Sequence, residues 1–194
     1  MKQPILYGAV ITLLLIGGIS SSGLLAARDI DASVMLKTAQ SLFASGKSNE
    51  AIKSINGILK ENPKNFEAYK LLGKIFASQN EYEKAEKSFQ TAASLDATDG
   101  DLFYQLGLLY VKKGNAQGAI RSFILTVKND PKNYEAYHNL GNIALATGNP
   151  KQALEYYNKV MAINPSHQPT IKNMSQISRI LQEAQKQKQN PVAK

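Results

Sequence analysis

The sequence predicts an all-α fold, a right-handed α-solenoid of antiparallel helix hairpins. Three columns of residues lead to this prediction. The positions of each column recur at one constant interval, which is the spacing between Ala51 and Ala85. Small residues let two helices approach closely, and proline ends the second helix of a pair. One hairpin cannot bury its own apolar stripe, so successive hairpins must stack. The columns are Ala51, Ala85, Ala119 and Ala153, then Gly73, Gly107 and Gly141 with Ala39 in the first unit, then Pro63, Pro131 and Pro165 with Ala97 in the second unit.

A fourth column marks the turn inside each unit. It holds residue types that tolerate a left-handed backbone, namely Gly46, Asn80, Gly114 and Gly148. With the turns placed there, each unit contains two helices of similar length. The predicted units are residues 32–65, 66–99, 100–133 and 134–167.

The large residues of these units resemble the tetratricopeptide repeat (TPR), a family whose repeat is about 34 residues long. The first helices carry Tyr69-x-x-Leu72-Gly73-x-x-Phe76, Phe103-x-x-Leu106-Gly107-x-x-Tyr110 and Tyr137-x-x-Leu140-Gly141-x-x-Ala144. The second helices carry Ala85-x-x-x-Phe89, Ala119-x-x-x-Phe123 and Ala153-x-x-x-Tyr157. The resemblance implies a TPR superhelix of four repeats, of which the first, with Ile55 in the aromatic position, is the least typical.

Residues 1–27 precede the repeats and form a separate region. No charged residue occurs between Gln3 and Ala27, and Lys2 stands before the apolar run. As a signal peptide, the run would end at the small residues 20–22. As a transmembrane anchor, residues 4–27 exceed the roughly 20 residues that a spanning helix needs. We favour the anchor because Leu24 and Leu25 continue the apolar run, and we expect residues 28–31 to form a short linker.

Both interpretations place the repeats outside the cytoplasm, because Lys2 favours a cytoplasmic amino terminus. We therefore expect a single-pass membrane protein with its repeats on the non-cytoplasmic side. The alternatives are a periplasmic or secreted protein after signal cleavage, or a protein of an organelle membrane. After the repeats, apolar residues at helical spacing predict a capping helix over 168–184, and 185–194 form a polar, basic tail.

Composition and motifs give no sign of an enzyme. The chain has no cysteine, its two histidines stand far apart in the sequence, and it has no phosphate-binding glycine loop. We therefore predict no catalytic residue, no metal site and no cofactor. The net charge of +8 is compatible with an acidic partner or anionic lipid. Nucleic-acid binding is not favoured, because stacking aromatics are not interleaved with the basic residues.

The family resemblance also implies which residues face a partner. In TPR proteins, certain first-helix positions line the concave groove. The polar members could bond a peptide backbone, the apolar members could accept side chains, and Lys70 with Lys74 could meet a carboxylate. The predicted groove residues are Leu36, Gln40, Phe43, Lys70, Lys74, Tyr104, Leu108, Lys112, His138, Asn139, Asn142 and Leu145.

The function that these features predict is a membrane-associated adaptor or scaffold. It would bind a partner protein, by a peptide or a helix, in its groove and so support the assembly of a larger complex. One alternative is a self-assembling homo-oligomeric scaffold that coats a membrane or an organelle, as in magnetosome-associated members of the family. Another is a secreted or periplasmic assembly factor.

Overall fold

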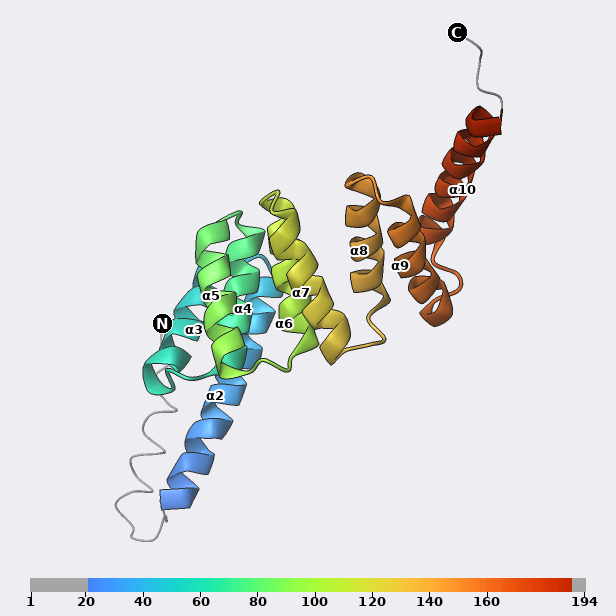
Figure 1. Ribbon diagram of the computed structural model, residues 1–194. Coiled ribbons are helices and arrows are strands. Elements are labelled where there is room, and N and C mark those ends of the chain that lie inside the picture. The colour runs from blue at the N-terminus through green and yellow to red at the C-terminus, as the bar shows by residue number, and fades with distance from the viewer. Residues whose placement is uncertain (1–20, 190–194) are drawn as a thin grey trace.

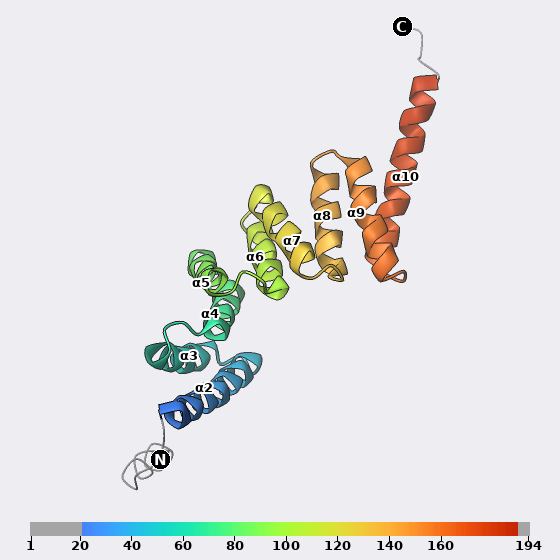
Figure 2. The same cartoon turned by 60° about the horizontal axis from the view of Figure 1, so that its bottom comes forward.

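The computed structural model describes residues 21–189, and within that range the chain is helical with no strand. Eight of the helices form four hairpins that follow one another along an elongated, curved stack, and a ninth lies at its end (Figures 1 and 2). The all-α solenoid predicted from the sequence is confirmed. Its helices are α2 (Ser21–Ala44), α3 (Ser48–Glu61), α4 (Phe66–Ser78), α5 (Tyr82–Leu95), α6 (Gly100–Lys112), α7 (Ala116–Asn129), α8 (Tyr134–Ala146), α9 (Pro150–Ile163) and α10 (Gln168–Gln189).

Each turn inside a hairpin uses a left-handed residue, as the column at these positions predicts. The φ angles are +79° at Gly46, +61° at Asn80, +69° at Gly114 and +79° at Gly148. Asparagine tolerates this conformation better than most residues with a side chain, which explains its presence in the second repeat.

Side-chain caps fix where the first helices of repeats 2 to 4 begin. The side chains of Asn65, Asp99 and Asn133 accept hydrogen bonds from the backbone N–H groups three residues further on, at 2.9, 2.7 and 2.9 Å. Each cap satisfies a backbone donor that the helix itself leaves free. The three caps are separated by one repeat length, so the repeat boundary is set by one recurring local interaction.

In three of the four hairpins the core forms where a glycine on the first helix faces an aromatic ring on the second. In repeats 2 to 4 the pairs are Gly73 with Phe89, Gly107 with Phe123, and Gly141 with Tyr157. The alanine column is fully buried at all four positions, Ala51, Ala85, Ala119 and Ala153. Close packing of this kind leaves the remaining faces of the first helices available for other contacts.

The two ends of the structure extend beyond the repeats. Helix α2 runs without interruption from Ser21 through residues 28–31, which the sequence analysis assigns to a linker. Most of the segment predicted as an anchor or signal peptide, residues 4–20, lies outside the described residues. Among residues 21–189, no helix is both long and apolar enough to cross a membrane. At the other end, α10 contains the expected capping helix and continues to Gln189, into the expected tail.

Candidate partner-binding groove

The first helices of repeats 1 to 3 lie next to one another and form one side of the stack. Helix α4 contacts both α2 and α6, whereas α3, α5 and α7 make no comparable contact with one another within residues 21–189. Because the first helices are closer together, they line the inner side of the curve. The predicted groove residues belong to these first helices, and all except Gln40 and Lys112 are half-buried.

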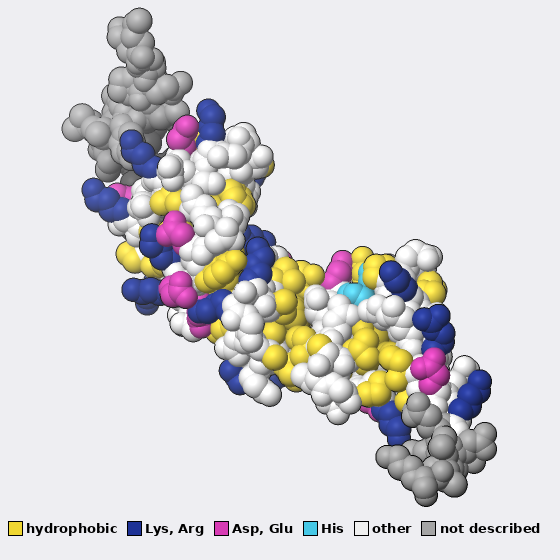
Figure 3. All heavy atoms as spheres, turned by 90° about the horizontal axis from the view of Figure 1, so that it is seen from above, with side chains coloured by type: hydrophobic (Ala, Val, Ile, Leu, Met, Phe, Trp, Pro, Cys, Tyr) yellow, Lys and Arg dark blue, Asp and Glu magenta, His cyan; other side chains and the backbone are white. Residues whose placement is uncertain are grey.

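A depression of about 290 Å³ opens where α2, α4 and α6 meet. It brings together four predicted groove residues from three successive repeats. Ala77 and Ser78 also line it without being predicted groove residues, although they occupy the same repeat positions as Leu145 and Ala146 in the fourth repeat. The lining residues are Phe43, Lys74, Ala77, Ser78, Gln105, Leu108, Leu109 and Lys112. On the molecular face in Figure 3, hydrophobic side chains gather over the middle of the molecule.

Lys70 and Lys74 of α4 are paired with carboxylates at the start of α6. The Nζ of Lys70 lies 2.7 Å from Asp99 Oδ2, and the Nζ of Lys74 lies 2.8 Å from Asp101 Oδ2. Burial disfavours the charged form of Lys70, but the hydrogen bond to Asp99 and the nearby Glu67 outweigh it, so the pKa of Lys70 is raised. Since these ammonium groups already have partners, they hold repeats 2 and 3 together.

Two predicted groove residues of the fourth repeat, His138 and Asn142, contact α10. The side-chain nitrogen of Asn173 on α10 donates to Asn142 Oδ1 at 2.9 Å and to the Tyr157 hydroxyl at 3.0 Å. That hydroxyl in turn donates to Asn142 at 2.7 Å. Leu145 packs in the same cluster as Ile177 of α10. Asn142 and Leu145 are predicted groove residues, and in the structure Asn142 bonds to α10 while Leu145 shares a core cluster with it.

The other predicted residues lie between these two regions or at the first repeat. Tyr104 packs against the Phe123 ring with centroids 5.8 Å apart. Burial, with the charge of Glu135, raises the pKa of its hydroxyl, and Asn139 partly offsets the shift. Leu36 packs against the core of the first hairpin, and Gln40 is exposed.

Two histidines and a threonine connect α8, the turn between α9 and α10, and α10 itself. The fully buried hydroxyl of Thr170 lies 2.8 Å from Nδ1 of His138 and 2.7 Å from Nδ1 of His167. A hydroxyl has one hydrogen, so it donates to one ring and accepts from the other. The two rings also contact each other edge to face, with centroids 4.8 Å apart. Both hydrogen bonds to Thr170 can therefore persist only while the ring that accepts the threonine hydrogen is neutral.

We expect acid to destabilise this contact. Burial lowers the pKa of His138, and the nearby His167 lowers it further. The unfolded chain therefore binds a proton more readily than the folded chain. Stability should be highest above the unfolded pKa of about 6.5 and should fall as the pH decreases below it. The other ionisable group stacked on the His138 ring is Tyr157, which is neutral across this range.

The measurement is urea unfolding at several pH values between 8 and 5, with His138→Gln as the comparison. In the variant, the free energy of unfolding should decrease less below pH 6.5, because one titrating ring is absent. An identical pH dependence in the variant and the original protein would contradict the prediction.

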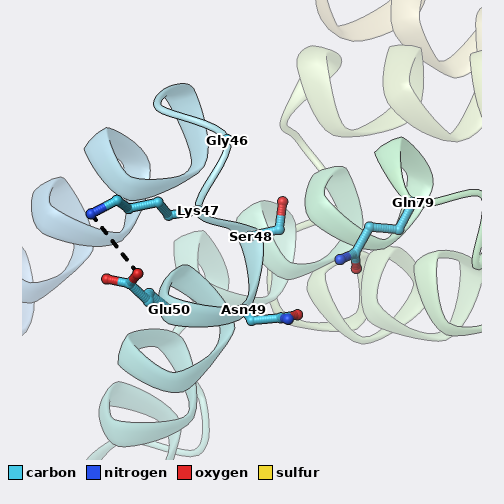
Figure 4. Close-up of a pocket in the computed structure, with 6 residues that line it drawn as sticks. All are labelled: Gly46, Lys47, Ser48, Asn49, Glu50 and Gln79. Atoms are coloured by element: carbon cyan, nitrogen blue, oxygen red, sulfur yellow. Dashed lines mark ion pairs between the residues drawn. The ribbon is translucent and has the colours of Figure 1, made fainter.

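A second depression, of about 330 Å³, lies at the turn ends of repeats 1 and 2 (Figure 4). It is polar and surrounds the start of α3, where Lys47 Nζ is 3.9 Å from Glu50 Oε1. The Oε1 atom of Gln79 is buried at its edge without a hydrogen-bond partner. Among the described residues there is no group of three His, Cys, Asp or Glu side chains placed to hold a metal ion. The apolar depression at α2, α4 and α6 is thus the better candidate for contacting a partner.

Comparison with known structures gives the same fold. The structure of MamA superimposes with a TM-score of 0.66 at 26% identity, over 74% of this chain and 84% of that chain. PilF from Pseudomonas aeruginosa has a TM-score of 0.73 at 18% identity, over 81% and 72%. A tetratricopeptide repeat protein from Parabacteroides merdae has a TM-score of 0.71 at 16% identity, over 78% and 60%. No curated protein sequence matches the chain.

Family comparison identifies the repeats themselves. Tetratricopeptide-repeat patterns match residues 36–101, 100–133 and 134–167, which together include most of the described helices. The matches at 100–133 and 134–167 coincide with predicted units. The repeating caps, left-handed turns and glycine–aromatic pairs agree with them. The chain therefore belongs to the tetratricopeptide-repeat family.

Proposed function

We propose that the protein is a membrane-associated scaffold that holds a partner protein in the groove of its first three repeats. The partner contributes a peptide or a helix, and the complex supports the assembly of a larger structure. In this role the protein acts by binding and not by catalysis. The observation that carries the proposal is the apolar depression between α2, α4 and α6, which lies on the inner face of a TPR solenoid.

The depression has the form expected of a docking site. Its apolar floor comes from three helices, so a single side chain inserted there would contact three repeats at once. Phe43 and Leu108 are half-buried, and each keeps part of its side chain open to solvent. Burying such a surface against a partner is favourable by roughly 25 cal/mol per Å² of apolar area.

The membrane part of the proposal is supported by the sequence alone. Residues 4–27 contain no charge and are long enough to span a bilayer. A retained anchor would hold the repeats close to the membrane surface, where a partner is captured. The mass of the mature protein, together with its partition between membrane and soluble fractions, tests this part separately from the groove.

The groove part is tested by crosslinking in cells that produce the full chain. A photoreactive benzoylphenylalanine replaces Phe43 in the depression, or Ile124 on α7 as the control. Ile124 is 46% exposed and does not line the depression. We expect a discrete adduct from position 43 and none from position 124, and mass spectrometry identifies the captured chain.

A substitution then tests whether the partner binds in the groove or elsewhere on the surface. Leu108→Asp places a charge on the apolar floor, and we expect it to weaken binding at least about tenfold, which is ~1.4 kcal/mol. Ile124→Asp should leave the adduct unchanged. If both variants give the same yield, the partner binds elsewhere. An adduct at twice the mass of the chain would identify a second copy as the occupant.

A further inference from the structure

The polar groups around the depression are already engaged within the protein. Lys74 pairs with Asp101, and the side-chain nitrogen of Gln105 donates to the same carboxylate at 3.1 Å. The Ser78 hydroxyl donates to the backbone oxygen of Ile75 at 2.7 Å. A partner that enters the depression therefore meets few free hydrogen-bonding groups, and its contribution there must be an apolar side chain.

Lys112 is the exception among these lining residues. It is the last residue of α6, its side chain is exposed, and it forms no ion pair with any residue of the described range 21–189. The next residue, Lys113, is engaged by contrast: its Nζ lies 2.6 Å from Glu86 Oε2 and 3.5 Å from Glu83 Oε1. The chain thus neutralises Lys113 and leaves the charge of Lys112 at the rim of the depression.

The apolar surface continues beside this lysine. Val111 is 47% exposed and occupies the repeat position that Phe43 has in repeat 1 and Ala77 has in repeat 2. An apolar floor next to one unpaired cation complements a segment in which a large apolar side chain stands near a carboxylate. A basic segment would meet the charge of Lys112 at the same place and would be repelled.

The other half of the groove is less available, because α10 contacts His138 and Asn142 there and shares a core cluster with Leu145. Taking the proposed groove function as its basis, we propose that the partner is an acidic amphipathic segment of a protein. Its apolar side chain occupies the depression between α2, α4 and α6, and an adjacent carboxylate pairs with Lys112.

The test is selection of random dodecapeptides, displayed on phage, against the protein and against Lys112→Glu. The original protein should enrich peptides in which Leu, Ile, Phe or Met lies within one helical turn of Asp or Glu. Lys112→Glu should lose the acidic preference. Lys128→Glu is the matched control, since Lys128 is also exposed near the end of a helix but lies on α7, outside the depression.

The best peptide is then synthesised with a fluorescent label and titrated against each variant. We expect Lys112→Glu to weaken its binding about fivefold or more, an effect that added salt reduces, whereas Lys128→Glu has no effect. Replacing the acidic residue of the peptide by Gln or Asn should cause a similar loss with the original protein and little further loss with Lys112→Glu.

Two different failures can be distinguished. If Leu108→Asp abolishes binding but the selected peptides show no acidic preference and Lys112→Glu binds normally, the inference about the partner is wrong and the groove function stands. If no selected peptide is affected by Leu108→Asp, the depression is not a docking site, and both proposals are wrong.

Discussion

Ile177→Asp is expected to detach α10 from the fourth repeat. Of the substitutions proposed here for stability measurements, it should cause the largest loss. Ile177 is fully buried in the cluster that contains Ala144, Ala153 and Tyr157. Removing its side chain alone should lower the free energy of unfolding by ~2–5 kcal/mol. The carboxylate adds to this loss, because it would be buried without a partner.

Ile180→Asp is a matched control on the same helix. Ile180 is 51% exposed, and an aspartate there stays in water, so the change should be within about 0.5 kcal/mol. Urea unfolding followed by circular dichroism measures the stability of both variants. Hydrogen exchange should become faster in α10 and in the end of α8 that contacts it. Equal stability of the two variants would contradict the packing described for α10.

Gly73→Ala is expected to destabilise the second repeat. A Cβ atom at this position would lie 2.5 Å from Cδ1 of Phe89, a ring that is 1% exposed. This separation is far below van der Waals contact, and the surrounding core leaves the ring little room to move. Overpacking of this kind typically costs ~1–3 kcal/mol, although alanine favours a helix over glycine by almost ~1 kcal/mol.

Gly57→Ala provides the comparison for Gly73→Ala. Gly57 also lies inside a helix, but an added Cβ there meets only the terminal methyl group of Met35, at 3.1 Å. That methyl group ends a flexible side chain, so it can move aside and the helix gains from alanine. Thermal unfolding should show a lower midpoint for Gly73→Ala and an unchanged or higher midpoint for Gly57→Ala. A higher midpoint for Gly73→Ala would mean that the helices are less closely packed than the structure shows.

The hairpins could be predicted from the sequence because their determinants are local and repeated. Gly73 and Phe89 belong to the same hairpin, so one close approach explains both columns of the pattern. The left-handed turns, with Asn80 among three glycines, follow from backbone sterics at single residues. Features of this kind recur at the same spacing, and each copy supports the interpretation of the others.

The arrangement of the groove was harder to predict, because it depends on the angle between repeats. Lys70 and Asp99 are 29 residues apart, and no single hairpin brings them together. The family position identified Lys70 as a groove residue but carried no information about a partner at the start of α6. The same holds for Asn142 and Asn173, whose contact requires both the fourth repeat and α10.

Two features of α2 and α10 could be predicted from the sequence, although not from the spacing of apolar residues alone. No proline or glycine interrupts residues 24–44, in agreement with the continuous helix α2 in place of a linker at 28–31. Thr170 and Ile177 stand one repeat length after Ala136 and Ile143, so α10 continues the register of the first helices. The repeat spacing therefore continues beyond residue 167.

This register bears on how the chain can change in length. Helix α10 occupies the repeat position of a first helix, and it contacts the fourth repeat through Thr170 and Ile177. One additional complete repeat inserted between His167 and Gln168 would leave α10 in the same phase relative to the unit before it. Duplication in whole units therefore preserves the terminal packing, whereas an insertion of any other length shifts it. Evolution can therefore lengthen the groove by adding repeats while the packing of α10 stays the same.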